Sequence, residues 1–490
     1  MSSPSPQPNI RRKRWSTRRK TLLSLLALAV LWGGFEIVWR VTGEPAPLVD
    51  YFAMLNDLVA SYQPDTGENG WETMMEVVVM FAEIEADAAD IKNSEDNIYT
   101  YTDTYFQLLR LNPYEPDRYP REMFALEQME LRGVNEALQK VADMPVIRRT
   151  YTGGGMVIAN IFLPELGRFR GLAKARSASM RLASEADDFE GLVAGFEQCL
   201  AIARVSGAQA TVIELLVGAA IIALTFGELT NILTERHLDE TTCRALLAAI
   251  DRQLNWPPPE ITIEADRIST LDSIQNCFTD DGHGSGRIDP DNFGLLTGGG
   301  SALGVISSIF QAGRQETTDK THEIYDQVVR LSRLTYRQRR VEADQLDLSI
   351  ENLSFRHDFL TQMISAPAQW LDVYDLTLMQ QRSTRLMLHL EIFYARHGRY
   401  PDSLGELDPD VLPEMLIDPL NDGPFFYHRL HDEAHGMPYV LYSLGVDGID
   451  QHADVEITDV LIDFPYSTFT EEGIDLLLSR PRETRQEYDQ

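Results

Sequence analysis

The chain has 490 residues, of which 44% are hydrophobic and 24% are charged. It is therefore long enough for two or three domains with proper cores, and its composition excludes an intrinsically disordered protein. Its 75 acidic and 43 basic side chains give a net charge of −32 at pH 7. This charge argues against nucleic-acid binding, because an acidic surface repels phosphate. Its main effect is on solubility, although it also attracts divalent cations.

The basic residues are unevenly distributed along the chain. The first 20 residues, which we interpret as a cytoplasmic tail, contain no acidic side chain and seven basic ones: Arg11, Arg12, Lys13, Arg14, Arg18, Arg19 and Lys20. The other 36 basic and all 75 acidic side chains give the rest of the chain a net charge of −39. The concentration of positive charge at the N-terminus indicates which side of a membrane the N-terminus would occupy.

Residues 21–40 predict a transmembrane anchor. The segment from Thr21 to Trp39 has about 18 nearly continuous apolar residues, enough to cross a hydrocarbon core of roughly 30 Å. Positive charges precede this segment, and only Arg40 follows it closely, so we expect a cytoplasmic N-terminus and a periplasmic bulk at the inner membrane. A cleavable signal peptide is the alternative, but no small-x-small cleavage site follows the apolar segment.

Residues 51–278 have helical periodicity and predict a helical domain after a short Pro-containing linker. Segments 166–183 and 187–204 predict two helices joined by a short turn, with small residues Ala173, Ala183 and Ala194 at packing positions. This pair loosely resembles one tetratricopeptide unit, and generic helix pairing explains it equally well.

The most apolar segment of the helical domain is 211–226. It contains ten uninterrupted apolar residues, Leu215 to Leu224, which is too short to span a bilayer, so we expect a buried helix. The next helix is expected to begin at the N-cap candidate Asp239 and to end before the prolines at 257–259.

A Gly/Asp-rich loop is expected over 279–300, followed by a helical segment over 301–380. Part of this loop has the spacing of an EF-hand, with acceptable residues at Asp281, Ser285, Gly286, Ile288 and Asp289 but weak ligands at His283 and Asn292. A Gly-rich surface turn is the favoured interpretation. Residues 295–310 predict a packed helix rather than a second membrane segment.

The last part of the chain differs in character. Residues 381–465 predict a small α+β module, in which an amphipathic helix ending at Gly398 precedes an antiparallel hairpin. Residues 466–490 predict an acidic C-terminal tail. The segments H-G-R-Y-P-D-S-L-G-E-L, D-P-L-N-D-G-P-F-F-Y and Y-V-L-Y-S-L-G-V-D-G-I-D follow one another in this module. Their order resembles the soluble domain of the major pseudopilin of type II secretion systems, over about residues 383–463.

The resemblance to the pseudopilin implies a calcium site in the loop after the last hairpin strand. It implicates the Leu444 carbonyl, and also Ser443, together with the side chains of Asp447, Asp450 and Asp454. Calcium takes six to eight hard oxygen ligands, and the glycines in this loop permit the turns that expose carbonyl groups. The alternative is a polar turn whose Asp side chains cap their own backbone.

The chain also departs from the pseudopilin pattern. It has no prepilin peptidase site, and a long helical region separates the anchor from the module, so we do not expect a pilus subunit. The helical region resembles uncharacterised membrane-anchored helical proteins of planctomycete-like bacteria, a resemblance that implies an architecture and no activity.

Other chemistry is weakly indicated. Cys199, Cys243 and Cys277 are few and far apart, which predicts buried free thiols and no disulfide framework. His428, His431 and His435 surround the hairpin turn, where an exposed polar turn is favoured over a zinc site. Neither a hydrolase nucleophile elbow nor a phosphate loop is present.

Together these features predict a mainly α fold, with a transmembrane anchor, an extended helical domain that is loosely tetratricopeptide-like, and a small α+β C-terminal module. The expected function is a scaffold or interaction protein accessory to secretion or envelope organisation, with protein partners and a calcium-stabilised module. The alternative is an envelope-associated hydrolase whose active site lies in the helical domain.

Overall fold

The computed structural model describes residues 17–42, 48–64, 66–89, 91, 120–153, 157–161, 163–280, 286–289, 311–364, 367, 369–407, 411–430, 438–450 and 476–479. The fold is mainly helical with a small antiparallel sheet, as the sequence predicted. The chain divides into two compact units. The first comprises residues 1–49, 273–320 and 353–362, and the second comprises 50–272, 321–352 and 363–490.

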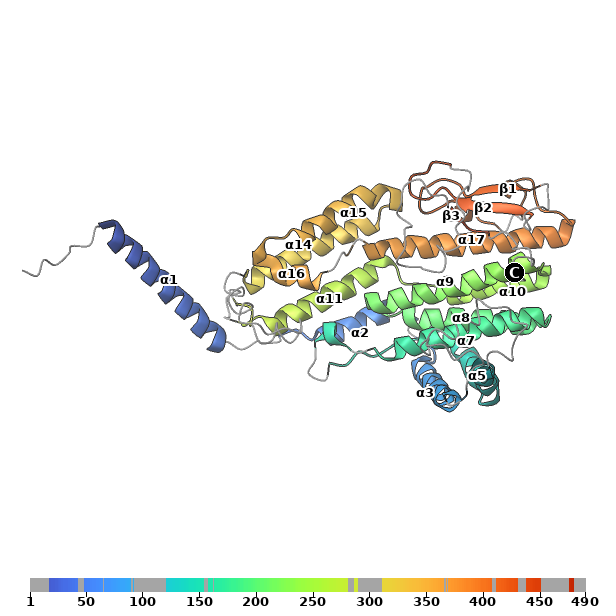
Figure 1. Ribbon diagram of the computed structural model, residues 1–490, viewed down its shortest axis with the longest axis horizontal. Helices are drawn as coiled ribbons and strands as arrows, with labels where there is room; N and C mark the ends of the chain where they lie inside the picture. The colour runs from blue at the N-terminus through green and yellow to red at the C-terminus, as the bar shows by residue number, and fades with distance from the viewer. Residues whose placement is uncertain are drawn as a thin grey trace, which may run out of the picture. The chain divides into compact units, whose positions relative to one another are not determined.

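The first unit contains α1, which runs from Thr17 to Thr42 (Figure 1). Its 26 residues correspond to a length of about 39 Å at the rise of an α-helix. Most side chains between residues 21 and 35 are exposed, with Leu31 70% and Phe35 64% exposed. A continuous apolar helix is thus confirmed, and its insertion in a membrane stays a prediction.

The rest of the first unit is built around a short antiparallel contact. Phe278 forms a β-bridge with Ile288, and the amide of Thr279 donates to the carbonyl of Arg287 at 2.8 Å. A Cβ atom at Gly286 would lie 1.7 Å from the carbonyl oxygen of Thr279, so this position requires glycine. The Phe278 ring packs edge-on against Phe359, with 5.2 Å between the ring centroids.

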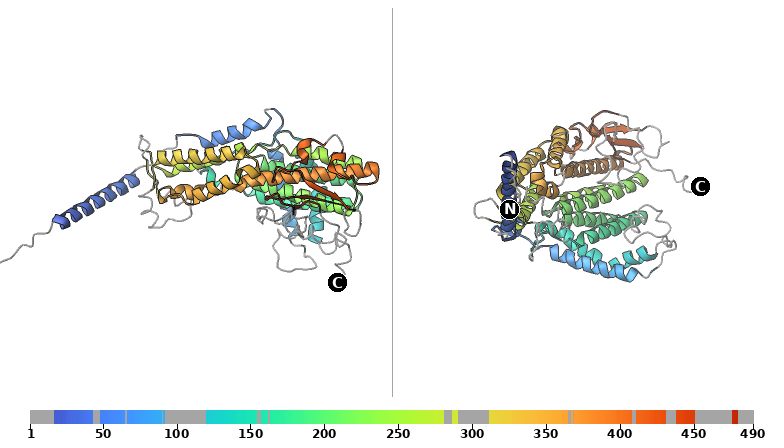
Figure 2. Two further views of the ribbon diagram at one scale, coloured as in Figure 1. Left: turned by 90° about the horizontal axis from the view of Figure 1, so that it is seen from above. Right: turned by 60° about the vertical axis from the view of Figure 1, so that its left-hand side comes forward.

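The second unit is a stack of helical layers with the sheet on one side (Figures 1 and 2). The layers run from α3, α5 and α6 through α7 and α8 to α9 and α10, then to α17 and the sheet. The helices are α2 (Tyr51–Tyr62), α3 (Trp71–Ala88), α5 (Pro120–Leu131), α6 (Val134–Asp143), α7 (Glu165–Glu185), α8 (Phe189–Gly207), α9 (Val212–Glu235), α10 (Glu240–Gln253), α15 (Tyr336–Glu351) and α17 (Gln369–His397). Three helices include residues of both units: α11 (Pro259–Cys277), α14 (Arg314–Ser332) and α16 (Asp358–Met363).

The predicted hairpin of α7 and α8 is confirmed. The turn between them places Asp187 in a left-handed conformation with φ 57°, and the side chain of Asp188 caps α8 by accepting from the amide of Gly191 at 2.9 Å. Close packing of the two helices depends on Gly195, where a Cβ atom would lie 2.9 Å from Cγ of Met180.

The apolar helix α9 lies inside the second unit, as predicted. Among the described residues it alone has the length and apolar composition to cross a membrane, yet 61% of its apolar window is buried in the fold. Thr211 and Glu214 form a capping box at its N-terminus. Glu228, further along the helix, is buried against Arg181 of α7, which identifies α9 as a core helix.

Helix α17 joins the sheet to the helical layers, and one hydrophobic core runs from α3 to the sheet. The helix begins at Gln369, so the predicted boundary at 381 falls within it. It ends at His397, followed by Gly398 at φ 68°, in agreement with the predicted stop. The module therefore packs directly on α9 and α10 instead of forming a separate core.

The predicted hairpin consists of β1 (Phe426–Arg429) and β2 (Tyr439–Ser443), which pair antiparallel with Phe426 opposite Tyr442. A third strand, β3 (Leu476–Leu477), pairs antiparallel with the other edge of β2, in the order β1-β2-β3. This strand falls in the segment predicted as an acidic tail. Leu476 and Leu478 are buried there, so these residues belong to the core.

Candidate functional site

The predicted calcium loop follows β2 directly. Gly445 and Gly448 adopt left-handed conformations, with φ 60° and 67°, which turn the chain back on itself. Oδ1 of Asp447 accepts a hydrogen bond from the amide of Ile449 at 2.9 Å. Oδ1 of Asp450 accepts from the hydroxyl of Tyr442 at 3.1 Å, and Leu444 is buried. Asp454 lies outside the described residues.

This loop is anchored by Asp418, which the sequence interpretation missed. Its carboxylate is fully buried and accepts hydrogen bonds from the hydroxyl of Ser443, the amide of Leu420 and Nδ2 of Asn421. Burial raises the pKa of Asp418 to about 6. The Ser443 hydroxyl in turn accepts from the amide of Gly445 at 3.0 Å. Asp418 thus fixes the start of the loop from within the protein.

The predicted metal site is only partly described, because one of its carboxylates lies outside the described residues. Within the part of the chain that the structure describes, no three His, Cys, Asp or Glu side chains are arranged to hold an ion. Leu444, Asp447 and Asp450 lie in one short loop. Both carboxylates already accept hydrogen bonds, Asp447 from the amide of Ile449 and Asp450 from the hydroxyl of Tyr442. That these residues and Asp454 bind one calcium ion together stays a prediction.

The other sequence candidates are only partly described. His428 lies on β1, where Nε2 is 3.3 Å from the hydroxyl of Tyr442, while His431 and His435 lie outside the described residues. In the EF-hand-like segment, Ile288 is buried in a β-bridge. Asp281, His283, Ser285 and Asn292 fall outside the described part. All three cysteines are buried free thiols, as predicted.

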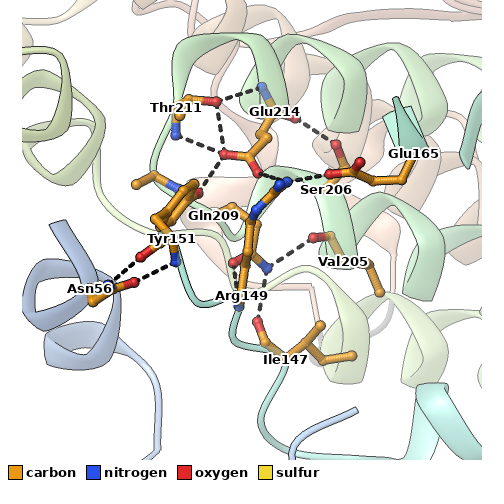
Figure 3. A network of polar contacts seen from close by, with 11 residues as sticks. Asn56, Ile147, Arg149, Tyr151, Glu165, Val205, Ser206, Gln209, Thr211 and Glu214 are labelled. Atoms are coloured by element: carbon orange, nitrogen blue, oxygen red, sulfur yellow. Dashed lines mark hydrogen bonds and ion pairs between the residues drawn. The ribbon is translucent and has the colours of Figure 1, made fainter. Parts of the chain in front are cut away.

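A buried polar network surrounds Glu214 at the start of α9 (Figure 3). Oε2 of Glu214 accepts hydrogen bonds from the hydroxyl of Tyr151 at 2.6 Å and from the hydroxyl of Thr211 at 2.8 Å. Burial raises the pKa of the Glu214 carboxyl and that of the Tyr151 hydroxyl. The Tyr151 hydroxyl also accepts from the amide of Ala210 at 3.1 Å.

Arg149 supplies the positive charge of this network. It forms ion pairs with Glu165 on α7 and with Glu214, the latter at 3.3 Å. Its guanidinium lies over the rings of Trp71 and Tyr151, 5.2 and 5.3 Å from their centroids. The network therefore ties the segment that contains Arg149 and Tyr151 to α7 and α9. Because all of these partners of Glu214 belong to the protein's own fold, the network suits a role in stability better than one in proton transfer.

A second polar cluster links α17 to the turn between α9 and α10. Nδ1 of His237 lies 3.1 Å from Oε2 of the buried Glu391, and the hydroxyl of Tyr400 donates to Oε1 of Glu391 at 2.5 Å. The imidazole stacks on Tyr394, with 4.1 Å between the ring centroids. The His237 side chain is 37% exposed, so a carboxylate-oriented imidazole reaches solvent here.

Comparison with known proteins does not assign this chain to a family. No protein-family model, no curated protein and no solved structure matches it. The function must therefore be inferred from the arrangement of the chain's own residues.

Proposed function

We propose that this protein is a scaffold or interaction protein anchored in the inner membrane by α1, with its bulk in the periplasm, and accessory to secretion or envelope organisation. The observation that carries this proposal is the continuous apolar surface of α1. Leu22, Leu25, Leu28 and Leu31 are each at least 60% exposed. A bilayer is the environment that such a surface fits.

The construction of the second unit supports the scaffold role. Its buried charges pair with one another across helices, as Arg149 does with Glu214 and Arg181 with Glu228. One core connects the outer helices to the sheet. Such a body holds its surfaces in fixed relative positions, which is what an interaction protein needs.

Membrane anchoring can be tested with the full chain expressed in bacterial cells. We expect the protein to stay in the membrane fraction after alkaline carbonate extraction. Arginine at the centre of a membrane helix costs about 2.5–3.5 kcal/mol per residue on insertion scales, so the double variant Leu28→Arg, Val30→Arg should move to the soluble fraction. The matched control Leu28→Ile, Val30→Leu should remain in the membrane. Extraction of the unchanged protein by carbonate would refute the anchor.

We also propose that calcium stabilises the C-terminal module through the loop that contains Leu444, Asp447, Asp450 and Asp454. Two observations support this: the left-handed glycines that shape the loop, and the Asp418 hydrogen bonds that hold its first residues in place. A loop held at one end needs little further ordering to receive an ion.

A hydrolase is the second candidate function, and the cluster around His237 is the observation that favours it. A buried carboxylate that accepts from Nδ1 leaves Nε2 as a general base, which is how many hydrolases prepare their histidine. Purified full-length protein should then cleave simple nitrophenyl esters, and both His237→Gln and Glu391→Gln should abolish the activity. Equal ester cleavage by the wild type and the His237→Gln variant would exclude this function.

A further inference from the structure

A groove open to solvent crosses α6, α8 and α10 in the second unit. It has a volume of about 370 Å³, which falls within the range of small-ligand sites. The groove shares no lining residue with the calcium loop, the Glu214 network or the His237 cluster. Its lining residues are Gln139, Phe189, Glu190, Val193, Ala194, Glu197, Thr241, Thr242 and Ala245.

The lining combines an apolar surface with negative charge. Phe189, Val193, Ala194 and Ala245 supply the apolar part. Two carboxylates line the groove and no basic side chain does. Glu197 is already bound by Arg252, whose Nε donates to it at 2.7 Å. Glu190 is exposed and has no ion-pair partner among the described residues, so it is the carboxylate available to a bound cation.

Two buried glutamines lie behind this lining and donate hydrogen bonds to it. Gln198 donates from Nε2 to Oε1 of Gln139 at 3.3 Å, and Gln253 donates from Nε2 to Oε1 of Glu197 at 3.1 Å. These bonds fix the orientation of both amides. The Oε1 atoms of Gln198 and Gln253 are buried and receive no donor from the described residues. Both atoms lie behind the lining, and the contribution of the two glutamines to the groove is to hold Gln139 and Glu197 in place.

We propose that this groove binds a lysine- or arginine-bearing basic segment of a partner protein. The aliphatic stem of a basic side chain covers the apolar lining while its charged end reaches Glu190, as long cationic side chains do on mixed surfaces. The strongly acidic body attracts such a segment from a distance. This inference names the kind of partner that the proposed scaffold binds, and its biological role rests on that proposed function. Binding in the groove itself does not depend on α1.

The test uses the full chain in nanodiscs of zwitterionic lipid and a fluorescently labelled oligolysine peptide, with fluorescence anisotropy at low ionic strength. Oligolysine should bind, and Glu190→Gln should raise Kd about fivefold, the effect of removing one partly exposed ion pair. Ala194→Trp, which fills the groove, should raise Kd roughly tenfold or more. An oligomer of ornithine has the same charge but a stem one methylene shorter, and it should bind more weakly than oligolysine.

The control variant is Glu83→Gln, which removes one exposed carboxylate from α3, away from the groove. Its Kd for oligolysine should stay within twofold of the wild type, apart from long-range charge effects. Equal changes in Kd for Glu190→Gln and Glu83→Gln would overturn the proposal, as would equal binding of the two oligomers or no binding of oligolysine. If Ala194→Trp fails to fold, the comparison of Glu190→Gln with Glu83→Gln still tests whether the peptide binds in the groove. Failure here would leave the membrane fractionation result for α1 unaffected.

Discussion

Arg181 of α7 and Glu228 of α9 form a bidentate pair inside the second unit, with Nε to Oε1 at 2.7 Å and Nη2 to Oε2 at 3.2 Å. Both side chains are nearly buried, with 12% and 3% of their surfaces exposed. The pair crosses the layer between α7 and α9. It places a fixed charge contact among the buried side chains of both helices.

Removing one member of this pair should destabilise the protein strongly. We expect Glu228→Leu to lower the free energy of unfolding by about 3–5 kcal/mol, because Arg181 is left buried without a partner. The double variant Arg181→Met, Glu228→Leu should recover most of that loss. Chemical denaturation of the three proteins measures both effects. If the double variant is no more stable than Glu228→Leu, the loss of stability does not come from leaving Arg181 buried without a partner.

Gly218 and Gly227 of α9 provide a matched pair for testing helix contact. A Cβ atom at Gly218 would lie 2.7 Å from the Cα of Gly207 on α8, so Gly218→Ala should separate the helices and destabilise the fold by about 1–3 kcal/mol. Nothing lies within 4 Å of a Cβ atom at Gly227. Gly227→Ala should therefore stabilise the helix by roughly 0.5–1 kcal/mol. Thermal unfolding of both variants should show shifts of opposite sign.

Asp266 of α11 should make stability depend on pH. Burial raises its pKa to about 6, although the hydroxyl of Tyr325, which donates to it at 2.7 Å, partly opposes this. The folded state therefore holds the proton more tightly than the unfolded state, and the stabilisation present below the unfolded pKa is lost as pH rises to about 6.

Asp266→Asn keeps an acceptor for Tyr325 and removes this titration. Relative to the variant, the wild type should lose about 2 kcal/mol of stability between about pH 4.5 and pH 7.5. Chemical denaturation of both proteins at the two pH values measures this difference. The contributions of all other titrating groups are the same in the two proteins, so they cancel in the comparison. A difference that does not change with pH would mean that Asp266 titrates normally.

The Tyr151 hydroxyl is both a donor to Glu214 and an acceptor from the amide of Ala210. Tyr151→Phe should therefore lower the free energy of unfolding by about 1–3 kcal/mol, since both partners remain buried. A double-mutant cycle with Glu214→Gln should give an interaction energy different from zero. Strict additivity in this cycle would contradict direct coupling of the two side chains.

Calcium binding should raise the melting temperature of the full-length protein. The full chain is required, because a fragment starting near 380 would cut α17 and remove its packing on α9 and α10. Asp447→Asn and Asp450→Asn keep the observed capping acceptors but lose charge, so each should reduce the calcium-dependent shift with little change in the metal-free melting temperature. An unchanged melting temperature at millimolar calcium would refute the site.

Local signals explain which parts of the fold could be predicted. The α7–α8 hairpin, the cap at Asp239 and the stop at Gly398 depend on neighbouring residues, and each was predicted correctly. The strand β3 has two residues, too few for a periodic pattern. Residues 369–380 were predicted to be helical and form the first part of α17.

Long-range pairs could not be predicted from the sequence. Arg149 and Glu214 are 65 residues apart, and nothing near either residue indicates the other. The same holds for His237 and Glu391. Burial of such a charge depends on how whole helices pack, so the candidate site around His237 appears only in three dimensions. Asp418 did carry a signal, since the turn D-P-L-N-D-G provides its partners Leu420 and Asn421.

The packing of α17 has a consequence for how the protein is made. The contact between His237 and Glu391 joins residues 154 positions apart, so α9 and α10 leave the ribosome long before the helix that covers them. At 5–20 residues per second this delay lasts roughly 8 to 30 s. The apolar surface of α9 and α10 that α17 covers in the folded protein is exposed during that time, and exposed apolar surface of this kind is where a partly synthesised chain aggregates.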